Sequence, residues 1–371
     1  MKIAIIHDDL VQFGGAEKVL LAFHEIWPKA PVYTLIASKK WKKVCKDLDI
    51  DLRVSFMDKL PWAEKLNRYF APFLLHLFAM ESFDLSDFGV VFSSSSRYAH
   101  GVITNANTKH ICYMNSPGRM FWEPDNYFEE EAYGILKPIR ALAKPFLSVP
   151  LSHIRHWDYI SSQRVDKFIA NATTPRKRIA SYYRRDAKII YPFVEYEKFS
   201  KGVPKKGNYF LALGRLPSWK RVDLAVQACT KLGLPLKVAG DGPDIDRLRK
   251  MAGETIEFLG HVTEEEKPGL LLGCIALIHT QREDFGIVPL EAMASGKPVI
   301  AYGAGGALET VKSGETGEFF YEQTSESLEE LLKIFDQDTY DPYKCRKQAR
   351  KFEKSRFLAF VKAFVCENAL Q

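Results

Sequence analysis

Two acidic residues, Glu283 and Glu291, stand eight positions apart in the stretch H-T-Q-R-E-D-F-G-I-V-P-L-E-A-M. They bracket a turn and the start of a predicted helix whose first turns contain Pro289. An ionised carboxylate accepts two hydroxyl hydrogen bonds in the geometry of a vicinal diol, which sugar rings and ribose both carry. Helix capping by Glu283 or Asp284 is the structural alternative. Gly286, which frees backbone N–H groups beside the first acid, favours ligand binding over capping.

Two cations, Arg215 and Lys220, directly follow a predicted strand in the stretch F-L-A-L-G-R-L-P-S-W-K. Ligands bind at the carboxyl ends of the strands in open parallel sheets, so both cations are expected at a ligand-binding edge. Arginine offers a fork of donors and lysine a point charge, and together they can neutralise a leaving diphosphate without a metal ion. Surface cations of an ordinary loop fit the same spacing.

Two Gly-Gly pairs lie where a strand is expected to turn into a helix: Gly14 with Gly15, and Gly305 with Gly306. Bare backbone N–H groups at a helix N-terminus can approach a phosphate, although such a pair is often simply a turn. Neither pair belongs to a G-x-G-x-x-G motif, which argues against the alternative of a nicotinamide-dependent oxidoreductase.

Short apolar runs alternate along the chain with longer segments of helical period, a pattern that predicts parallel strands joined by helical crossovers. The predicted strands are residues 2–7, 32–37, 90–93, 110–114, 168–171 and 188–191 in the first half, and 209–213, 236–239, 256–259, 276–279 and 299–302 in the second. The sequence therefore predicts an α/β protein with two doubly wound, Rossmann-like domains that face each other across a cleft.

The segment 192–208 is charged and rich in turn residues, so we place the domain boundary there. The N-terminal domain is then residues 1–192 and the C-terminal domain residues 193–355. Residues 356–371 form a predicted helix with an apolar face, which we expect to pack back on the N-terminal domain.

The composition, 46% hydrophobic and 26% charged over 371 residues, is that of a globular protein with full cores. Six scattered cysteines lack the C-x2-C spacing of a zinc or redox site, and no secretory leader is visible, so we expect reduced cysteines and a cytoplasmic protein. The longest apolar run, 70–80, is too short to span a bilayer. Residues 1–190 carry 27 Lys/Arg against 20 Asp/Glu, an excess that suits an anionic membrane surface, a phosphate-bearing acceptor or merely a solvated face.

The motifs together resemble the retaining glycosyltransferase family 4, whose members have the GT-B fold. The resemblance rests on G-G-A-E-K-V-L near the start, A-N-A-T-T-P-R-K-R-I at 170–179, G-R-L-P-S-W-K, G-D-G-P at 240–243, the E-x7-E motif continued by A-M-A-S-G-K-P-V-I-A, and G-G-A-L-E-T-V. The segments S-S-S-S-R-Y-A-H-G-V-I-T and I-C-Y-M-N-S-P-G-R-M-F-W are similar to O-antigen and polysaccharide mannosyltransferases of the WbaZ type.

The resemblance implies a role for each of these residues. Glu283 would meet hydroxyls of the donor sugar, Glu291 the ribose of the nucleotide, and Arg215 with Lys220 the diphosphate. Gly14 and Gly15 would line the same phosphates from the N-terminal, acceptor-binding domain, and Gly305 with Gly306 would lie near the donor. Val262 and Glu265 would lie at the base pocket. We assign four further positions to nucleotide-sugar binding: Phe285, Gly286, Ile287 and Val288.

One position departs from the family pattern, because this chain has Asn115 where the family usually has a histidine that touches the transferred sugar. Asparagine can donate and accept a hydrogen bond but cannot take up a proton near pH 7. We assign Asn115 to the catalytic group with Glu283, Arg215 and Lys220. A protein that binds a nucleotide sugar but turns it over slowly is the alternative.

The expected activity is retaining transfer of a hexose, mannose from GDP-mannose, onto a glycan or polyprenyl-linked saccharide in cell-surface polysaccharide (lipopolysaccharide) biosynthesis. A UDP-sugar donor is the alternative within the same fold. The paired acids Asp8 and Asp9 lack D-x-D spacing, and His153 with His156 lack a third ligand, so neither a metal nor another cofactor is expected.

Two further surfaces admit more than one interpretation. Residues 56–80 mix aromatic residues with Lys59, Lys65 and Arg68, a composition found in membrane-interface segments and in packed cores. The basic segment 176–185 could bind the phosphates of a lipid-linked acceptor. No nucleic-acid-binding motif accompanies it, so we expect no nucleic-acid partner and a peripheral contact with the inner face of the membrane.

Overall fold

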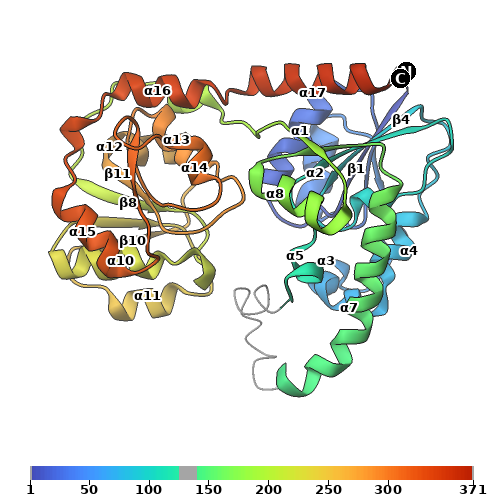
Figure 1. Cartoon of the computed structure of the whole chain (residues 1–371), viewed down its shortest axis with the longest axis horizontal. Coiled ribbons are helices and arrows are strands. Elements are labelled where there is room, and N and C mark those ends of the chain that lie inside the picture. Colours follow the sequence, from blue (N-terminus) through green and yellow to red (C-terminus); the bar gives the residue numbers. More distant parts are fainter. Residues whose placement is uncertain (1, 125–139, 370–371) are drawn as a thin grey trace. The chain divides into compact units, whose positions relative to one another are not determined.

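The computed structural model describes residues 2–124 and 140–369, with side chains at all of these except 68, 72 and 140–147. These residues divide into two compact units. The first contains the residues up to Tyr191 together with those from Leu358 onward, and the second runs from Pro192 to Phe357. Each unit is a parallel sheet with helices packed against it (Figure 1).

The first unit has a seven-stranded sheet in the order β3-β2-β1-β4-β5-β6-β7, and every neighbouring pair is parallel. The strands are β1 (Ile3–His7), β2 (Val32–Thr34), β3 (Leu52–Val54), β4 (Val90–Ser95), β5 (Lys109–Met114), β6 (Lys167–Ala170) and β7 (Ala187–Ile189). The helices are α1 (Gly15–Ile26), α2 (Lys39–Asp47), α3 (Ala63–Leu66), α4 (Leu75–Glu81), α5 (Arg119–Trp122), α7 (Arg140–Gln163) and α8 (Thr173–Arg178), with shorter turns η1 (Phe56–Lys59), η2 (Asn67–Phe73), η3 (Ala99–Gly101) and η5 (Ile179–Tyr183).

The second unit has a six-stranded parallel sheet in the order β10-β9-β8-β11-β12-β13. Its strands are β8 (Tyr209–Leu213), β9 (Leu236–Ala239), β10 (Ile256–Gly260), β11 (Cys274–His279), β12 (Val299–Tyr302) and β13 (Gly317–Phe320). Its helices are α9 (Tyr196–Phe199), α10 (Val222–Leu232), α11 (Ile245–Met251), α12 (Lys267–Gly273), α13 (Val288–Ala294), α14 (Ala307–Thr310), α15 (Ser325–Ile334) and α16 (Pro342–Arg350), with turns η6 (Ser218–Lys220) and η7 (Gln337–Thr339). Helix α17 (Lys354–Ala369) begins in this unit and ends in the first.

The central strands are buried over their whole length because helices cover both faces of a parallel sheet, which leaves room only for apolar runs. In β1 all five residues are buried. Helix α10 buries its apolar stripe in the core of the second unit and ends at Gly233, whose left-handed backbone (φ 64°) lets its N–H reach the carbonyl of Cys229.

The predicted α/β architecture of two doubly wound sheets is confirmed, and all eleven expected strands are present. Two strands were missed, β3 and β13. Both lie at the edge of a sheet, are short, and carry a polar residue inside a partly exposed run, so they lack the apolar pattern that marks the central strands.

A buried carboxylate fixes the loop after β4. The side chain of Asp8, 4% exposed, accepts hydrogen bonds from the backbone N–H groups of four consecutive residues, at 2.6 Å (Ser96), 3.0 Å (Arg97), 2.8 Å (Tyr98) and 2.7 Å (Ala99). The neighbouring Asp9 accepts from Asn67 and pairs with the guanidinium of Arg97. Both acids are therefore engaged within the protein, and no group of three His, Cys, Asp or Glu side chains among residues 2–124 and 140–369 could hold a metal ion.

Candidate functional site

The second unit contains an ion pair at the carboxyl edge of its sheet. Lys220 follows β8 and Glu283 follows β11, and these two strands are neighbours in the sheet. The Lys220 Nζ atom lies 3.0 Å from Glu283 Oε1, and the two side chains are only 11% and 20% exposed. The hydroxyl of Thr280 donates to the carbonyl of Lys220 at 2.8 Å and so fixes one loop against the other.

Two glycines leave space beside this pair. Gly214 has φ 140°, and a Cβ there would lie 3.2 Å from Lys220 Nζ. Gly286 has φ 84°, and a Cβ there would lie 3.2 Å from Glu283 Oε2 and 3.5 Å from His279 Nε2. Residues with a side chain rarely adopt such backbone angles, so both positions favour glycine. The backbone at Gly214 lies close to Lys220, and the backbone at Gly286 lies close to Glu283.

Glu283 is held in its charged form. Burial by itself raises the pKa of Glu283, but the neighbouring Lys220 ammonium, with hydrogen bonds from Lys220 and Gln281, outweighs that effect and lowers the pKa below its ordinary value. Gln281 adds a hydrogen bond from Nε2 to Glu283 Oε1 at 3.4 Å. A charged carboxylate whose Oε2 atom lies beside Gly286 is suited to accept hydrogen bonds from hydroxyl groups.

His279, the last residue of β11, is buried beside the same carboxylate. Burial lowers the pKa of His279 to about 4, with Lys220 acting in the same direction and Glu283 against it. The imidazole is therefore neutral at pH 7. Sequence reasoning missed His279 and Gln281 as site residues. The available signal was a run of polar residues, H-T-Q-R-E, that begins at the end of a buried strand.

The other cation predicted for this site, Arg215, lies on the same loop as Lys220, between Gly214 and the buried Leu216, with its own side chain exposed. The second predicted acid, Glu291, is 3% exposed and lies within α13. Helix α13 has Ile287 at its N-cap, so neither Glu283 nor Asp284 occupies the capping position that was the structural alternative.

The residues between the two acids shape the loop around Glu283. Phe285 is buried, with its ring 5.8 Å from that of Phe352, while Ile287 and Val288 are half-buried at the start of α13. Of the two residues predicted for the base pocket, Val262 is half-buried and Glu265 is exposed, both in the loop after β10.

Gly305 and Gly306 pack against the backbone of this loop. The N–H of Gly306 donates to the carbonyl of Glu283 at 2.9 Å, and a Cβ at Gly305 would lie 2.2 Å from the same oxygen. These contacts give the second Gly-Gly pair a structural role in holding Glu283.

The remaining predicted residues belong to the first unit. Gly14 is the N-cap of α1 and Gly15 its first residue, and a Cβ at Gly14 would lie 3.0 Å from Glu17 Oε2. Asn115 directly follows β5, and its backbone N–H donates to the carbonyl of Ser95 at 2.8 Å.

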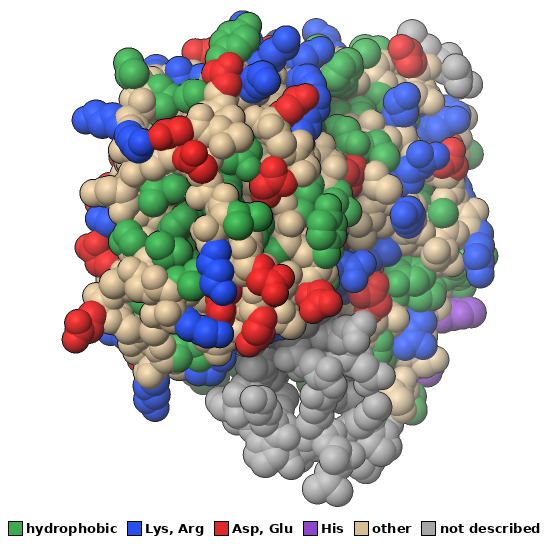
Figure 2. All heavy atoms as spheres, turned by 60° about the vertical axis from the view of Figure 1, so that its left-hand side comes forward, with side chains coloured by type: hydrophobic (Ala, Val, Ile, Leu, Met, Phe, Trp, Pro, Cys, Tyr) green, Lys and Arg blue, Asp and Glu red, His purple; other side chains and the backbone are tan. Residues whose placement is uncertain are grey.

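Part of the basic segment 176–185 is used inside the protein. Arg178 donates to Glu123 at 3.0 Å, and Arg185 donates to backbone carbonyls that include that of Val165 at 2.7 Å. The face of the molecule in Figure 2 mixes Lys and Arg with Asp and Glu side chains and shows no continuous basic field.

Residues 193–352 match the family described as glycosyl transferases group 1. Among curated proteins, the chain is 24% identical over 380 residues to the alpha-1,3/1,6-mannosyltransferase ALG2 of Candida glabrata, covering 84% of this chain and 78% of that protein. It is 31% identical over 187 residues to human ALG2, covering 40% of this chain and 44% of that protein. A GDP-mannose-dependent alpha-(1-6)-phosphatidylinositol monomannoside mannosyltransferase of Mycobacterium tuberculosis is 36% identical over 131 residues, 32% of each chain.

Apart from the Candida glabrata protein, the chain spans about half the length of these relatives or less. Several solved structures match almost the whole chain, including the following two. Anabaena HepE in complex with UDP has a TM-score of 0.73 at 18% identity, covering 99% of this chain and 100% of that one. A sucrose-phosphate synthase from Thermosynechococcus elongatus has a TM-score of 0.72 at 14% identity, covering 99% of each chain. At these identities the likeness shows the fold alone.

Proposed function

We propose that this chain, which has the GT-B fold and carries a glycosyl transferases group 1 domain at residues 193–352, is a retaining glycosyltransferase that uses a nucleotide-sugar donor. The observation that carries the proposal is the partly buried pair of Lys220 and Glu283 between two glycines at the edge of the second sheet. The pair offers one positive and one negative group to a ligand that itself has phosphates and hydroxyls.

In this mechanism Lys220 and Arg215 bind the diphosphate and stabilise the negative charge that develops on it as the bond to the sugar breaks. Glu283 accepts hydrogen bonds from hydroxyls of the transferred sugar, and Glu291 from the ribose. The neutral His279 lies near Gly286 with Glu283 and adds no charge to the site. Asn115 contacts the sugar by hydrogen bonding only, so the leaving phosphate itself takes the proton of the acceptor hydroxyl.

We propose GDP-mannose as the donor, because the relatives that align with this chain include mannosyltransferases, one of them named as GDP-mannose-dependent. In a thermal-shift titration of the whole chain, GDP is expected to raise the melting temperature at lower concentration than UDP or ADP, since a ligand bound only by the folded state stabilises it. A larger shift with UDP would indicate a UDP-sugar as the donor instead of GDP-mannose. The absence of a shift with every nucleoside diphosphate would contradict the proposed function.

Turnover of the donor separates an enzyme from a protein that only binds it. Release of GDP from labelled GDP-mannose, with or without an acceptor, identifies an enzyme. A thermal shift without any release identifies a protein that binds the nucleotide sugar but does not turn it over. We propose that no metal ion or cofactor takes part, so the rate of release should be the same with and without EDTA.

The acceptor is proposed to be a glycan or a lipid-linked saccharide. No helix among the residues that the structure describes is long and apolar enough to cross a bilayer. A surface for peripheral contact is offered by exposed aromatic side chains between residues 56 and 78: Phe56, Trp62, Tyr69, Phe73 and Phe78. Lys59 and Lys65, exposed in the same segment, would favour an anionic surface. On this proposal the enzyme works at the inner face of the cell membrane.

Replacing Trp62 and Phe73 by serine is expected to lower binding to phosphatidylglycerol-containing vesicles by about tenfold or more, because each side chain is over 70% exposed and would bury its ring in the interface. Vesicle co-sedimentation measures this. Tyr343→Ser, which removes an aromatic side chain that is 69% exposed on the second unit, serves as the control and should bind like the wild type. Equal binding of all three proteins would refute this surface.

A further inference from the structure

Two half-buried asparagine side chains at the carboxyl edge of the first sheet each have one polar atom that is buried and makes no hydrogen bond among the described residues. Neither Nδ2 of Asn115 nor Oδ1 of Asn171 makes a hydrogen bond within the described part of the chain. Asn115 directly follows β5, and Asn171 directly follows β6. One of the unpaired atoms is a donor and the other an acceptor.

The register of the sheet brings the two asparagines to matched positions. Strands β5 and β6 are parallel neighbours, and their last registered pair is Met114 with Ala170. The ladder continues one step further, since the N–H of Asn171 donates to the carbonyl of Met114 at 3.4 Å. Residues at matched positions of neighbouring parallel strands project to the same face of a sheet, so the two amides lie on one side of it.

The loop that begins at Asn115 is held by a network of side-chain contacts to the residues that follow Asn115. Arg178 donates to the hydroxyl of Ser116 and, through Nε, to Glu123, both at 3.0 Å. Tyr182 also donates to Glu123, at 2.7 Å, and its ring stacks on that of Trp122 with centroids 4.7 Å apart. These contacts fix the loop without using the amide of Asn115.

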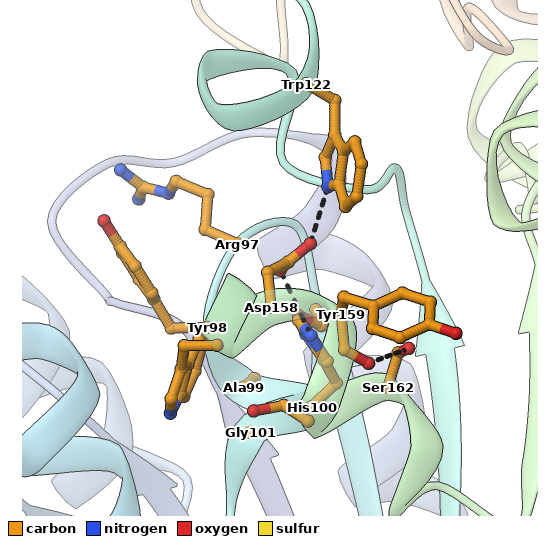
Figure 3. Close-up of polar contacts among 12 residues, drawn as sticks. Arg97, Tyr98, Ala99, His100, Gly101, Trp122, Asp158, Tyr159 and Ser162 are labelled. Atoms are coloured by element: carbon orange, nitrogen blue, oxygen red, sulfur yellow. Dashed lines mark hydrogen bonds and ion pairs between the residues drawn. The ribbon is translucent and has the colours of Figure 1, made fainter. Parts of the chain in front are cut away.

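Trp122 anchors this network in the interior. Its indole N–H donates to the fully buried carboxylate of Asp158 at 2.7 Å, and the same carboxylate lies 3.2 Å from His100 Nε2 (Figure 3). The residues that follow Asn115 are therefore held by side-chain contacts that reach the interior of the first unit.

Buried polar groups in folded proteins nearly always have partners, because leaving one unpaired costs stability. An unpaired donor and an unpaired acceptor that directly follow a registered pair of neighbouring strands match a group that accepts from one and donates to the other, which is what a hydroxyl does. We propose that Asn115 and Asn171 together bind one hydroxyl group of a sugar, which accepts from Asn115 Nδ2 and donates to Asn171 Oδ1. The choice of a sugar rests on the proposed function, and it makes Asn171 a further substrate-binding residue.

The test is the near-isosteric variant Asn171→Leu in the full-length chain, measured for both stability and turnover. Because the lost carbonyl has no partner in the folded protein, the melting temperature should stay the same or rise. The value of kcat/KM should fall by at least tenfold. Asn105→Leu, an exposed asparagine of the same unit whose Nδ2 contacts the carbonyl of Ser86 at 3.5 Å, is the matched control and should leave kcat/KM unchanged.

The double variant Asn115→Leu/Asn171→Leu tests whether the two amides share one hydroxyl. If they do, the second substitution adds little to the loss of kcat/KM caused by the first. A melting temperature that falls while kcat/KM stays constant, or losses that multiply independently, would overturn the proposal and leave these amides as the site of a structural water.

The origin of the hydroxyl is found from donor hydrolysis in the absence of acceptor. If Asn171→Leu lowers hydrolysis as much as transfer, the hydroxyl belongs to the donor sugar; if only transfer falls, it belongs to the acceptor. Should the wild-type chain neither bind nor cleave any nucleotide sugar, the proposed function fails but the pair can still be tested. Methyl α-mannopyranoside should then shift the side-chain amide NMR signals of Asn115 and Asn171 and not that of Asn105, and unchanged signals would overturn the inference.

Discussion

Replacing Lys220 by alanine is expected to lower kcat/KM for donor cleavage by about 100- to 1,000-fold, the usual effect of removing one preorganised group that stabilises developing charge. Lys220 is 8% exposed. Thr280 holds the backbone carbonyl of Lys220 and Glu283 holds its ammonium group, so the ammonium group is already in position before the donor binds. In the variant the pKa of Glu283 should also rise, because its main compensation for burial is gone.

The counterpart Glu283→Gln keeps the shape of the side chain and removes its charge, and it should reduce kcat/KM to a similar extent. Steady-state release of GDP measures both variants. Lys231→Ala is the matched control, since Lys231 forms a 2.7 Å ion pair with Glu329 at another place in the same unit. If Lys220→Ala and Glu283→Gln keep the turnover of Lys231→Ala, the proposed site is wrong.

Replacing Asp8 by alanine is expected to lower the free energy of unfolding by on the order of 4 kcal/mol or more. Its carboxylate is the acceptor for four backbone N–H groups, and each buried donor that loses its partner costs about 1–3 kcal/mol. Urea denaturation followed by circular dichroism measures the free energy of unfolding. The value for Asp8→Asn, which retains one carbonyl acceptor, should lie between those of the alanine variant and the wild type.

Asp84→Ala supplies the comparison for this prediction. Asp84 accepts hydrogen bonds from the N–H and hydroxyl of Ser86 on an exposed turn, and such contacts with solvent-accessible groups are worth about 1 kcal/mol or less. A loss for Asp8→Ala no greater than that for Asp84→Ala would show that the loop after β4 is held by its other contacts.

The central strands of both sheets could be predicted from the sequence because their burial on two faces demands apolar runs. Strand β1, I-A-I-I-H, leaves no other interpretation. The edge strand β3 could not be found this way, since Arg53 stands in its middle with its side chain exposed. What defines β3 is its pairing with β2, a contact that depends on the assembled sheet.

Lys220 and Glu283 were each predicted as site residues, but their mutual ion pair was not. They are far apart in sequence, and they meet because β8 and β11 are neighbours in the sheet, although two other strands, β9 and β10, lie between them along the chain. Strand order of this kind cannot be obtained from local spacing. The same limit hid the matched positions of Asn115 and Asn171, which directly follow the last registered pair of β5 and β6.

Asp8 illustrates the opposite case. The missing D-x-D spacing argued against a metal site at Asp8, but nothing in the local sequence predicts its four backbone partners. Those partners lie 88 to 91 residues away, directly after β4, and the parallel pairing of β1 with β4 brings them to the carboxylate.

Residues 358–369 of α17 belong to the first unit, although they follow the second unit in the sequence. During synthesis on the ribosome, the sequence of the second unit therefore emerges complete while the first still lacks Val361 and Val365, two fully buried residues of α17. Domains tend to fold in the order in which they leave the ribosome. Here the first unit begins earlier in the chain than the second but is completed later. Its hydrophobic core is therefore fully covered only after α17 has been synthesised.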